Sequence, residues 1–148
     1  MAHDAIDFSL NIGPKIQGAP LDLNGSYSSR AFSAHARTLI EAHPVDTPLY
    51  MYIAPQNVHL ACGANKKTEG IQAPCETVAL YPKVRQDAWK VQSAVTTELD
   101  YVVGNTTEAL KAAGLWATSL IAFASDNGGP LDHTTNWPLR GGKRAPVP

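Results

Sequence analysis

The chain has 148 residues, with 12 Lys+Arg against 13 Asp+Glu and a formal net charge of -1. This length suits one globular unit, and the balanced charge without a basic run argues against a protein that binds nucleic acid through the phosphate backbone. The longest apolar runs, at residues 49–55 and 119–124, are much shorter than the roughly 20 residues of a membrane-spanning helix. We therefore expect no nucleic-acid partner and no membrane span.

The first predicted element is an amphipathic helix over residues 29–43. Ser28 or Ser29 is the predicted N-cap, and Pro44 is the predicted stop. The apolar face has helical spacing and comprises Phe32, Ala36, Leu39, Ile40 and His43. Residues 49–54 follow as an apolar run that ends at Pro55, which predicts a parallel strand buried on both sides.

Residues 62–82 show no periodicity, so we expect a long surface loop there. A second helix is predicted from residue 84 to residue 111, with Gly114 and Leu115 forming a left-handed cap. Its apolar positions are Val84, Ala88, Val91, Val95, Leu99, Val102, Val103 and Leu110. The apolar run at 118–124 predicts another strand.

A long helix between two buried strands indicates a parallel βαβ unit with a right-handed crossover, and therefore an α/β fold. Parallel strands end at the same edge of a sheet. The loop after residue 54 and the loop after residue 124 are therefore expected at that edge, where open α/β sheets bind ligands.

Asp126 and Asn127 follow the second predicted strand and offer a carboxylate and an amide oxygen. Both are hard ligands suited to Ca²⁺ or Mg²⁺, and Gly128 and Gly129 would let the backbone approach an ion. The alternative is a simple turn, because Asn-Gly and Gly-Gly are common turn sequences. A complete divalent site would need more oxygen ligands than these two residues supply.

Two further side chains are candidates for chemistry. His59 lies just past the first predicted strand and could donate a proton to a leaving oxygen, or could serve only as a hydrogen-bonding loop residue. Lys143 could place an ammonium group against an oxyanion, or could be an ordinary solvated surface charge.

Cys62 and Cys75 are 13 residues apart and fit no zinc pattern, so a loop-closing disulfide and two free thiols both remain open. Asn24 and Asn105 begin two N-glycosylation triplets, which would matter only in a secreted protein. The first residues show no recognisable secretory signal, and the compartment stays open.

Four segments, at residues 25–43, 48–59, 98–116 and 123–143, resemble the sulfatases, and specifically the animal-type arylsulfatase B-like branch. They occur in the family's order. The resemblance covers about residues 22–143 of one partial domain over residues 1–148, with residues 1–21 and 144–148 irregular. The last segment, which runs from Phe123 to Lys143, is the most specific.

The resemblance implies part of an alkaline-phosphatase-like α/β/α sandwich and the hydrolysis of aryl or glycan sulfate esters with a formylglycine nucleophile and one Ca²⁺. Asp126 and Asn127 resemble two calcium ligands of the family. His59 resembles the histidine that contacts the sulfate ester and aids departure of the alcohol, and Lys143 resembles the lysine that holds sulfate oxygens. Intact relatives are expected in the lysosome or outside the cell.

The sequence also departs from the pattern of the sulfatase family. The family's nucleophile lies in a Cys-x-Pro-x-Arg motif, which neither Cys62 nor Cys75 begins. The paired aspartates that complete the calcium shell are also missing. We therefore expect an interior piece of a larger domain that is inactive alone. Two alternatives remain: a non-catalytic remnant that binds Ca²⁺, an anion or a partner protein, and a related phosphodiesterase or phosphatase.

Overall fold

The computed structural model describes residues 11–12, 15–16, 23, 25–59, 72–131 and 134–143. The elements are the strands β1 (Asn11–Ile12) and β2 (Lys15–Ile16), the helices α1 (Ser28–Glu41), α2 (Cys75–Val78) and α3 (Asp87–Ala112), and the 3-10 helix η2 (Trp116–Thr118). Strands β1 and β2 pair antiparallel. Among the described helices, none has the length and apolar character needed to cross a bilayer.

Helix α1 confirms the first predicted helix, but its buried face differs from the predicted one. The buried residues are Ser29, Ser33, Ala36 and Ile40. Leu39, by contrast, is 49% exposed. The buried serines make hydrogen bonds and not apolar contacts. Asn105 of α3, for example, donates to the Ser33 hydroxyl at 3.0 Å. The N-cap prediction was also wrong, since Tyr27 holds that position and makes no side-chain cap.

Helix α3 confirms the second predicted helix and most of its apolar stripe, although Val103 is exposed. Its C-terminus has the predicted cap. Gly114 has a φ of 73°, the Leu115 N–H donates to the Leu110 carbonyl at 2.9 Å, and the Gly114 N–H donates to the Lys111 carbonyl at 3.1 Å. These bonds form a Schellman motif, which ends the helix and turns Leu115 back into the core.

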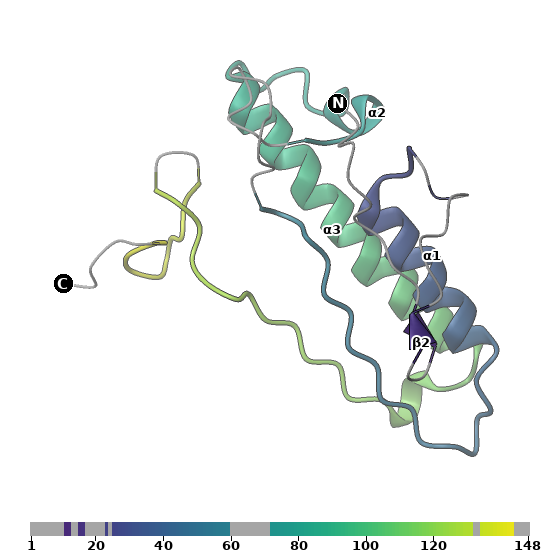
Figure 1. Ribbon diagram of the computed structural model, residues 1–148. Helices are drawn as coiled ribbons and strands as arrows, with labels where there is room; N and C mark the ends of the chain where they lie inside the picture. The colour runs from purple at the N-terminus through teal and green to yellow at the C-terminus, as the bar shows by residue number, and fades with distance from the viewer. Residues whose placement is uncertain are drawn as a thin grey trace.

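Helices α1 and α3 lie side by side and run in the same direction (Figure 1). The buried apolar side chains of the described residues form two clusters, of which the first joins α1 to α3 and the second joins α3 to α2. One comprises Ile40, Ala109, Leu110 and Leu115, with Met51 and Ala113 packed against it. The other comprises Val91 and Val95, with Ala73 and Val78 packed against it. The second cluster includes α2, so the segment predicted as an irregular loop over residues 62–82 contains a short packed helix.

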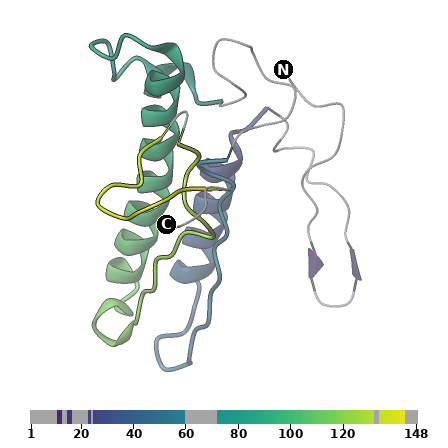
Figure 2. The ribbon, with the colours of Figure 1, turned by 90° about the vertical axis from the view of Figure 1, so that its left-hand side faces the viewer.

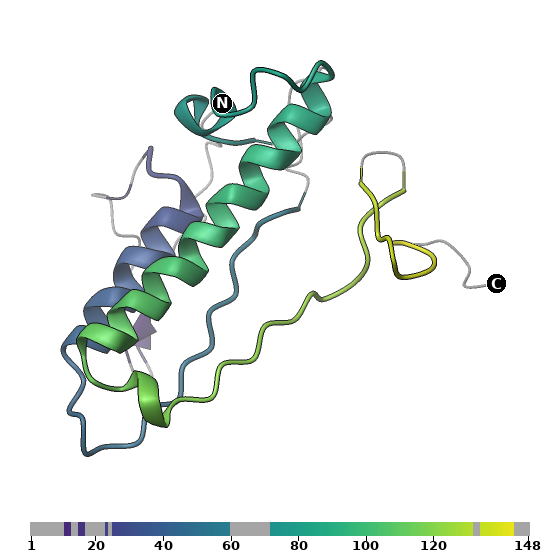
Figure 3. The same ribbon diagram turned by 180° about the vertical axis from the view of Figure 1, so that it is seen from behind.

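Of the two predicted strands, residues 49–54 and 119–124 are extended, whereas Thr118 belongs to η2; neither segment has a ladder assigned in the described ranges. Both run opposite to the helices, and hence in the same direction as each other, and they diverge toward their C-terminal ends (Figures 1 and 3). In the first segment Met51 and Ile53 are partly covered while Tyr50 and Tyr52 are 90% and 80% exposed. This alternation is typical of a strand covered on one face. The prediction of burial on both sides was therefore wrong for this segment, and residues 119–124 are exposed throughout. The α/β sandwich remains a prediction.

Candidate functional site

The turn that carries His59 is fixed to both helices through Asn57. The Asn57 Nδ2 group donates to the Val95 carbonyl of α3 at 2.8 Å and to the Tyr27 hydroxyl at 3.3 Å. The Ser29 hydroxyl of α1 donates to Asn57 Oδ1. Asn57 therefore joins α1, α3 and the first extended segment, and the turn closes through a bond from the His59 N–H to the Gln56 carbonyl at 3.0 Å.

An ion pair with one fully buried partner, Glu98, lies next to this turn and joins α1, α2 and α3. The Arg30 Nε and Nη2 groups donate to the two carboxylate oxygens of Glu98 at 2.8 and 2.6 Å, and Nη1 donates to Glu76 at 2.7 Å. The Glu98 side chain is 0% exposed. The Thr77 hydroxyl donates to the same carboxylate.

The electrostatics of this cluster follow from burial and pairing. Burial acts to raise the pKa of the Glu98 carboxyl, but the hydrogen bonds from Arg30 and Thr77 outweigh it, so the pKa lies below its usual value. The same pairing raises the pKa of Arg30. Burial raises the pKa of the neighbouring Tyr27 phenol, and the bond from Asn57 opposes that shift.

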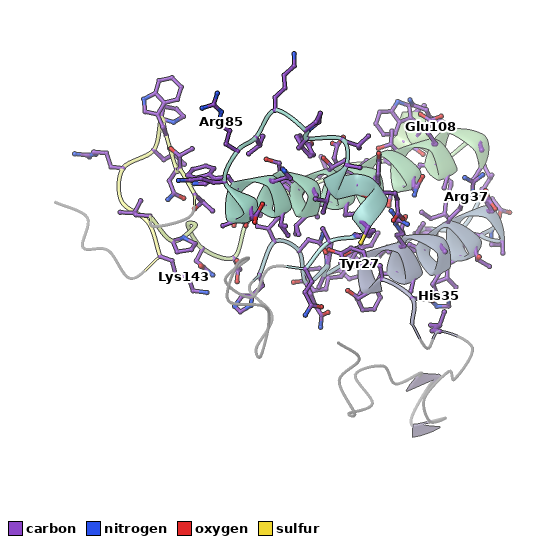
Figure 4. The ribbon with its side chains drawn as sticks, turned by 90° about the horizontal axis from the view of Figure 1, so that it is seen from above. Tyr27, His35, Arg37, Arg85, Glu108 and Lys143 are labelled. Carbon is purple, nitrogen blue, oxygen red and sulfur yellow. The ribbon has the colours of Figure 1, made fainter. Side chains whose placement is uncertain are left out.

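The second loop carries the other three predicted site residues. Asp126 and Asn127 are exposed at the end of the second extended segment, where the Ser125 hydroxyl donates to the Asn127 carbonyl at 2.6 Å. Lys143 belongs to the same loop, since its N–H donates to the Gly129 carbonyl at 3.0 Å. Figure 4 shows Lys143 on this loop, away from the helix pair.

Asn136 holds this loop together. Its Oδ1 atom accepts from the Gly129 N–H at 2.8 Å, and its Nδ2 group donates to the Gly129 carbonyl at 2.9 Å. We call the contacts among Gly129, Asn136 and Lys143 the Gly129 clasp. The clasp joins Lys143 to Gly129, and Asp126 and Asn127 directly precede this junction in the chain.

His59 stands apart from this loop. The two extended segments separate toward these ends in Figures 1 and 3. Between them lies a cavity of about 650 Å³, whose lining includes Val58 from the His59 turn, Gly129 and Asn136 from the clasp, and side chains of α3. In the side view of Figure 2 the yellow C-terminal loop stands in front of the helix pair, from which Figure 1 shows it to be separated. The two candidate loops thus border one open space.

Asp126 and Asn127 have ligand atoms of the type that Ca²⁺ prefers, but they are too few to form a complete site. Ca²⁺ takes six to eight oxygen ligands, and Asp126 and Asn127 offer oxygens of the right kind. Among the described residues, no group of three or more His, Cys, Asp and Glu side chains could hold a metal ion. Asp126 and Asn127 by themselves could therefore supply only part of a calcium shell.

The remaining predictions concern the two cysteines and the two N-glycosylation triplets. Cys75 is an exposed free thiol at the start of α2, and Cys62 lies outside the described residues. Asn24 also lies outside them. Asn105 lies in α3, and the amide nitrogen that a glycan would modify donates to Ser33.

The sequence reasoning missed Asn57, Asn136 and the Arg30–Glu98 pair. Glu98 gave a signal, because an ionisable residue in the apolar stripe of a helix requires a buried partner. The two asparagines gave none, because neither bond follows a helical or strand spacing: Asn57 bonds to Val95, 38 residues away, and Asn136 bonds to Gly129, 7 residues away.

Comparison with known proteins defines the class. The sulfatase family model matches residues 5–146, so the chain belongs to the sulfatase family. Among individual relatives it is similar to arylsulfatase J of Mus musculus, with 33% identity over 121 residues. That alignment covers 81% of this chain and 19% of the relative. The chain therefore spans about a fifth of the length of this curated relative.

Proposed function

We propose that this chain supplies part of the active site of a calcium-dependent sulfatase that hydrolyses aryl or glycan sulfate esters. The observation that carries the proposal is the sulfatase match over residues 5–146, together with the bond from the Lys143 N–H to the Gly129 carbonyl, two residues after Asn127. This match also favours a sulfate ester over the phosphate ester of a related phosphodiesterase or phosphatase.

Each candidate residue has a role suited to its chemistry. Asp126 and Asn127 would hold Ca²⁺ through hard oxygen ligands. When bound, a divalent cation at this place would stabilise negative charge on sulfate oxygens. The Lys143 ammonium would lie against the same oxygens and stabilise charge that develops on them. His59 would donate a proton to the departing alcohol oxygen.

These 148 residues are proposed to bind without turning over substrate. They contain no Cys-x-Pro-x-Arg motif, since Cys62 and Cys75 are the two cysteines and neither begins it. Without an activated nucleophile, charge stabilisation by Lys143 has no attacking group to assist. We expect no hydrolysis of 4-nitrophenyl sulfate by the isolated chain, with or without Ca²⁺. Calcium-stimulated turnover would contradict this part of the proposal.

Binding is tested by titrating calcium chloride, and then sodium sulfate, into the chain while following backbone amide shifts by NMR. We expect saturable shifts at Asp126 and Asn127 with Ca²⁺, and at Lys143 with sulfate. Asp126→Asn should abolish the calcium response. Asp46→Asn is the matched control, because Asp46 is also an exposed loop carboxylate. Equal responses in the two variants would refute the assignment of Asp126.

A further inference from the structure

Both backbone polar groups of Gly129, its N–H and its carbonyl, are held by one side chain. Asn136 accepts from the Gly129 N–H at 2.8 Å and donates to the Gly129 carbonyl at 2.9 Å. A carboxamide can satisfy both atoms because it carries an acceptor oxygen and a donor nitrogen, whereas an ionised carboxylate can only accept. The chemistry at position 136 therefore requires an amide.

The Gly129 carbonyl also accepts a hydrogen bond from the other end of the loop. It accepts from the Lys143 N–H at 3.0 Å, in addition to accepting from Asn136. Gly129 is two residues past Asn127 in the chain. One carbonyl thus connects the backbone of the proposed sulfate-binding lysine to the turn that bears the proposed calcium ligands.

Close backbone packing supports the same junction independently of these bonds. A Cβ atom on Gly142 would lie 2.7 Å from the Gly129 carbonyl oxygen, and a Cβ atom on Gly129 would lie 2.2 Å from the Thr134 hydroxyl oxygen. Neither approach is compatible with a larger residue without displacement of the neighbour. The two glycines therefore permit a contact that any other residue would push apart.

From these contacts we propose that Asn136 is a positioning residue, which fixes Lys143 relative to Asp126 and Asn127 through the Gly129 clasp. This inference rests on the proposed function, because it concerns the site that Asp126, Asn127 and Lys143 would form. Asn136 itself need not touch Ca²⁺ or sulfate. Its effect is that an ion at Asp126 and Asn127 is sensed at Lys143, because the Lys143 N–H bonds to the carbonyl of Gly129, which follows Asn127 by two residues.

The experiment compares the full 148-residue chain with Asn136→Ala and Asn136→Asp. Leu139→Ala is the matched control, because the Leu139 side chain is on the same loop and is 78% exposed. Calcium chloride is titrated, and amide shifts are followed by NMR at Asp126, Asn127 and Lys143. We expect Lys143 to respond with the same midpoint as Asp126 in the unmodified chain and in Leu139→Ala. In both Asn136 variants Asp126 should still respond, while the shift at Lys143 falls at least about threefold as the clasp opens.

A second readout separates failure of this inference from failure of the proposed function. Hydrogen exchange at the Gly129 and Lys143 amides reports the clasp without any ion, and we expect protection to fall about tenfold in Asn136→Ala while Leu139→Ala leaves it unchanged. Unchanged protection, or an unchanged Lys143 response to calcium, overturns the positioning role. Absence of any calcium response in the unmodified chain refutes the calcium site instead, and the exchange result then decides whether the clasp exists.

Discussion

Replacing Arg30 with methionine tests whether the buried ion pair holds the three helices together. The substitution removes both hydrogen bonds to Glu98 and the bond to Glu76, and it leaves the Glu98 carboxylate buried with Thr77 as its remaining side-chain donor. A buried charge without its partner is costly, because the low-dielectric interior does not replace the lost hydration. We expect the variant to be strongly destabilised.

The magnitude follows from the exposure of the two partners. Removing one member of a fully buried pair costs about 3–5 kcal/mol. The Glu98 side chain is fully buried, but Arg30 is 45% exposed, and solvent screens part of the interaction on that side. We therefore expect Arg30→Met to lower the free energy of unfolding by about 2–3 kcal/mol at neutral pH.

The assay is urea unfolding followed by helical circular dichroism, with the midpoint and slope compared between variants. Arg37→Met is the matched control, since Arg37 lies on the same helix and pairs with Glu41 at 2.7 Å with both side chains exposed. An exposed pair of this spacing contributes about 0.3–0.5 kcal/mol. If Arg30→Met is no more destabilising than Arg37→Met, the buried pair does not stabilise the helix assembly.

Three further predictions follow from the same contacts. The pKa of Glu98 is lowered in the folded chain. The ionised carboxylate therefore adds to the free energy of unfolding above the unfolded pKa of about 4.3, and this contribution should be lost as pH falls through the folded value. A Glu98→Gln variant that keeps the same acid dependence in urea unfolding would contradict this. Gly114→Ala should destabilise the chain by about 1 kcal/mol, because Gly114 has a φ of 73°. Gly104→Ala should stabilise it by about 0.5–1 kcal/mol, because Gly104 lies inside α3 with open space around it. Thermal melts that give both changes the same sign would refute this dependence on backbone conformation. Asn57→Ala should lower the free energy of unfolding by about 1–3 kcal/mol, because the buried Ser29 hydroxyl loses Asn57 as its acceptor. A urea midpoint equal to that of the unmodified chain would exclude the anchoring role of Asn57.

Local patterns predicted the helices well. Apolar spacing located α1 and α3, and a glycine followed by leucine predicted the cap at Gly114, because each depends on residues that are neighbours in the sequence. The motif segments likewise indicated the sulfatase family, which the family match shows. Residues 49–54 are extended as predicted, but they are covered on one face and not on both, because Tyr50 and Tyr52 are exposed; the sheet itself remains a prediction.

The tertiary structure decided which face of α1 is buried and how the candidate residues are held. Ser29 and Ser33 are buried because Asn57 and Asn105, from distant segments, satisfy their hydroxyl groups. Lys143 joins the loop of Asp126 because Gly129 accepts its N–H.

The sequence by itself thus determined the helical periodicity, the family and the candidate residues, since all of these follow from residue type and spacing along the chain. Only the tertiary structure decided that Asn57 anchors the His59 turn and that Asn136 closes the loop of Asp126 and Lys143. Hydrogen bonds between distant segments leave no periodic trace, because each requires the fold to bring one donor to one acceptor.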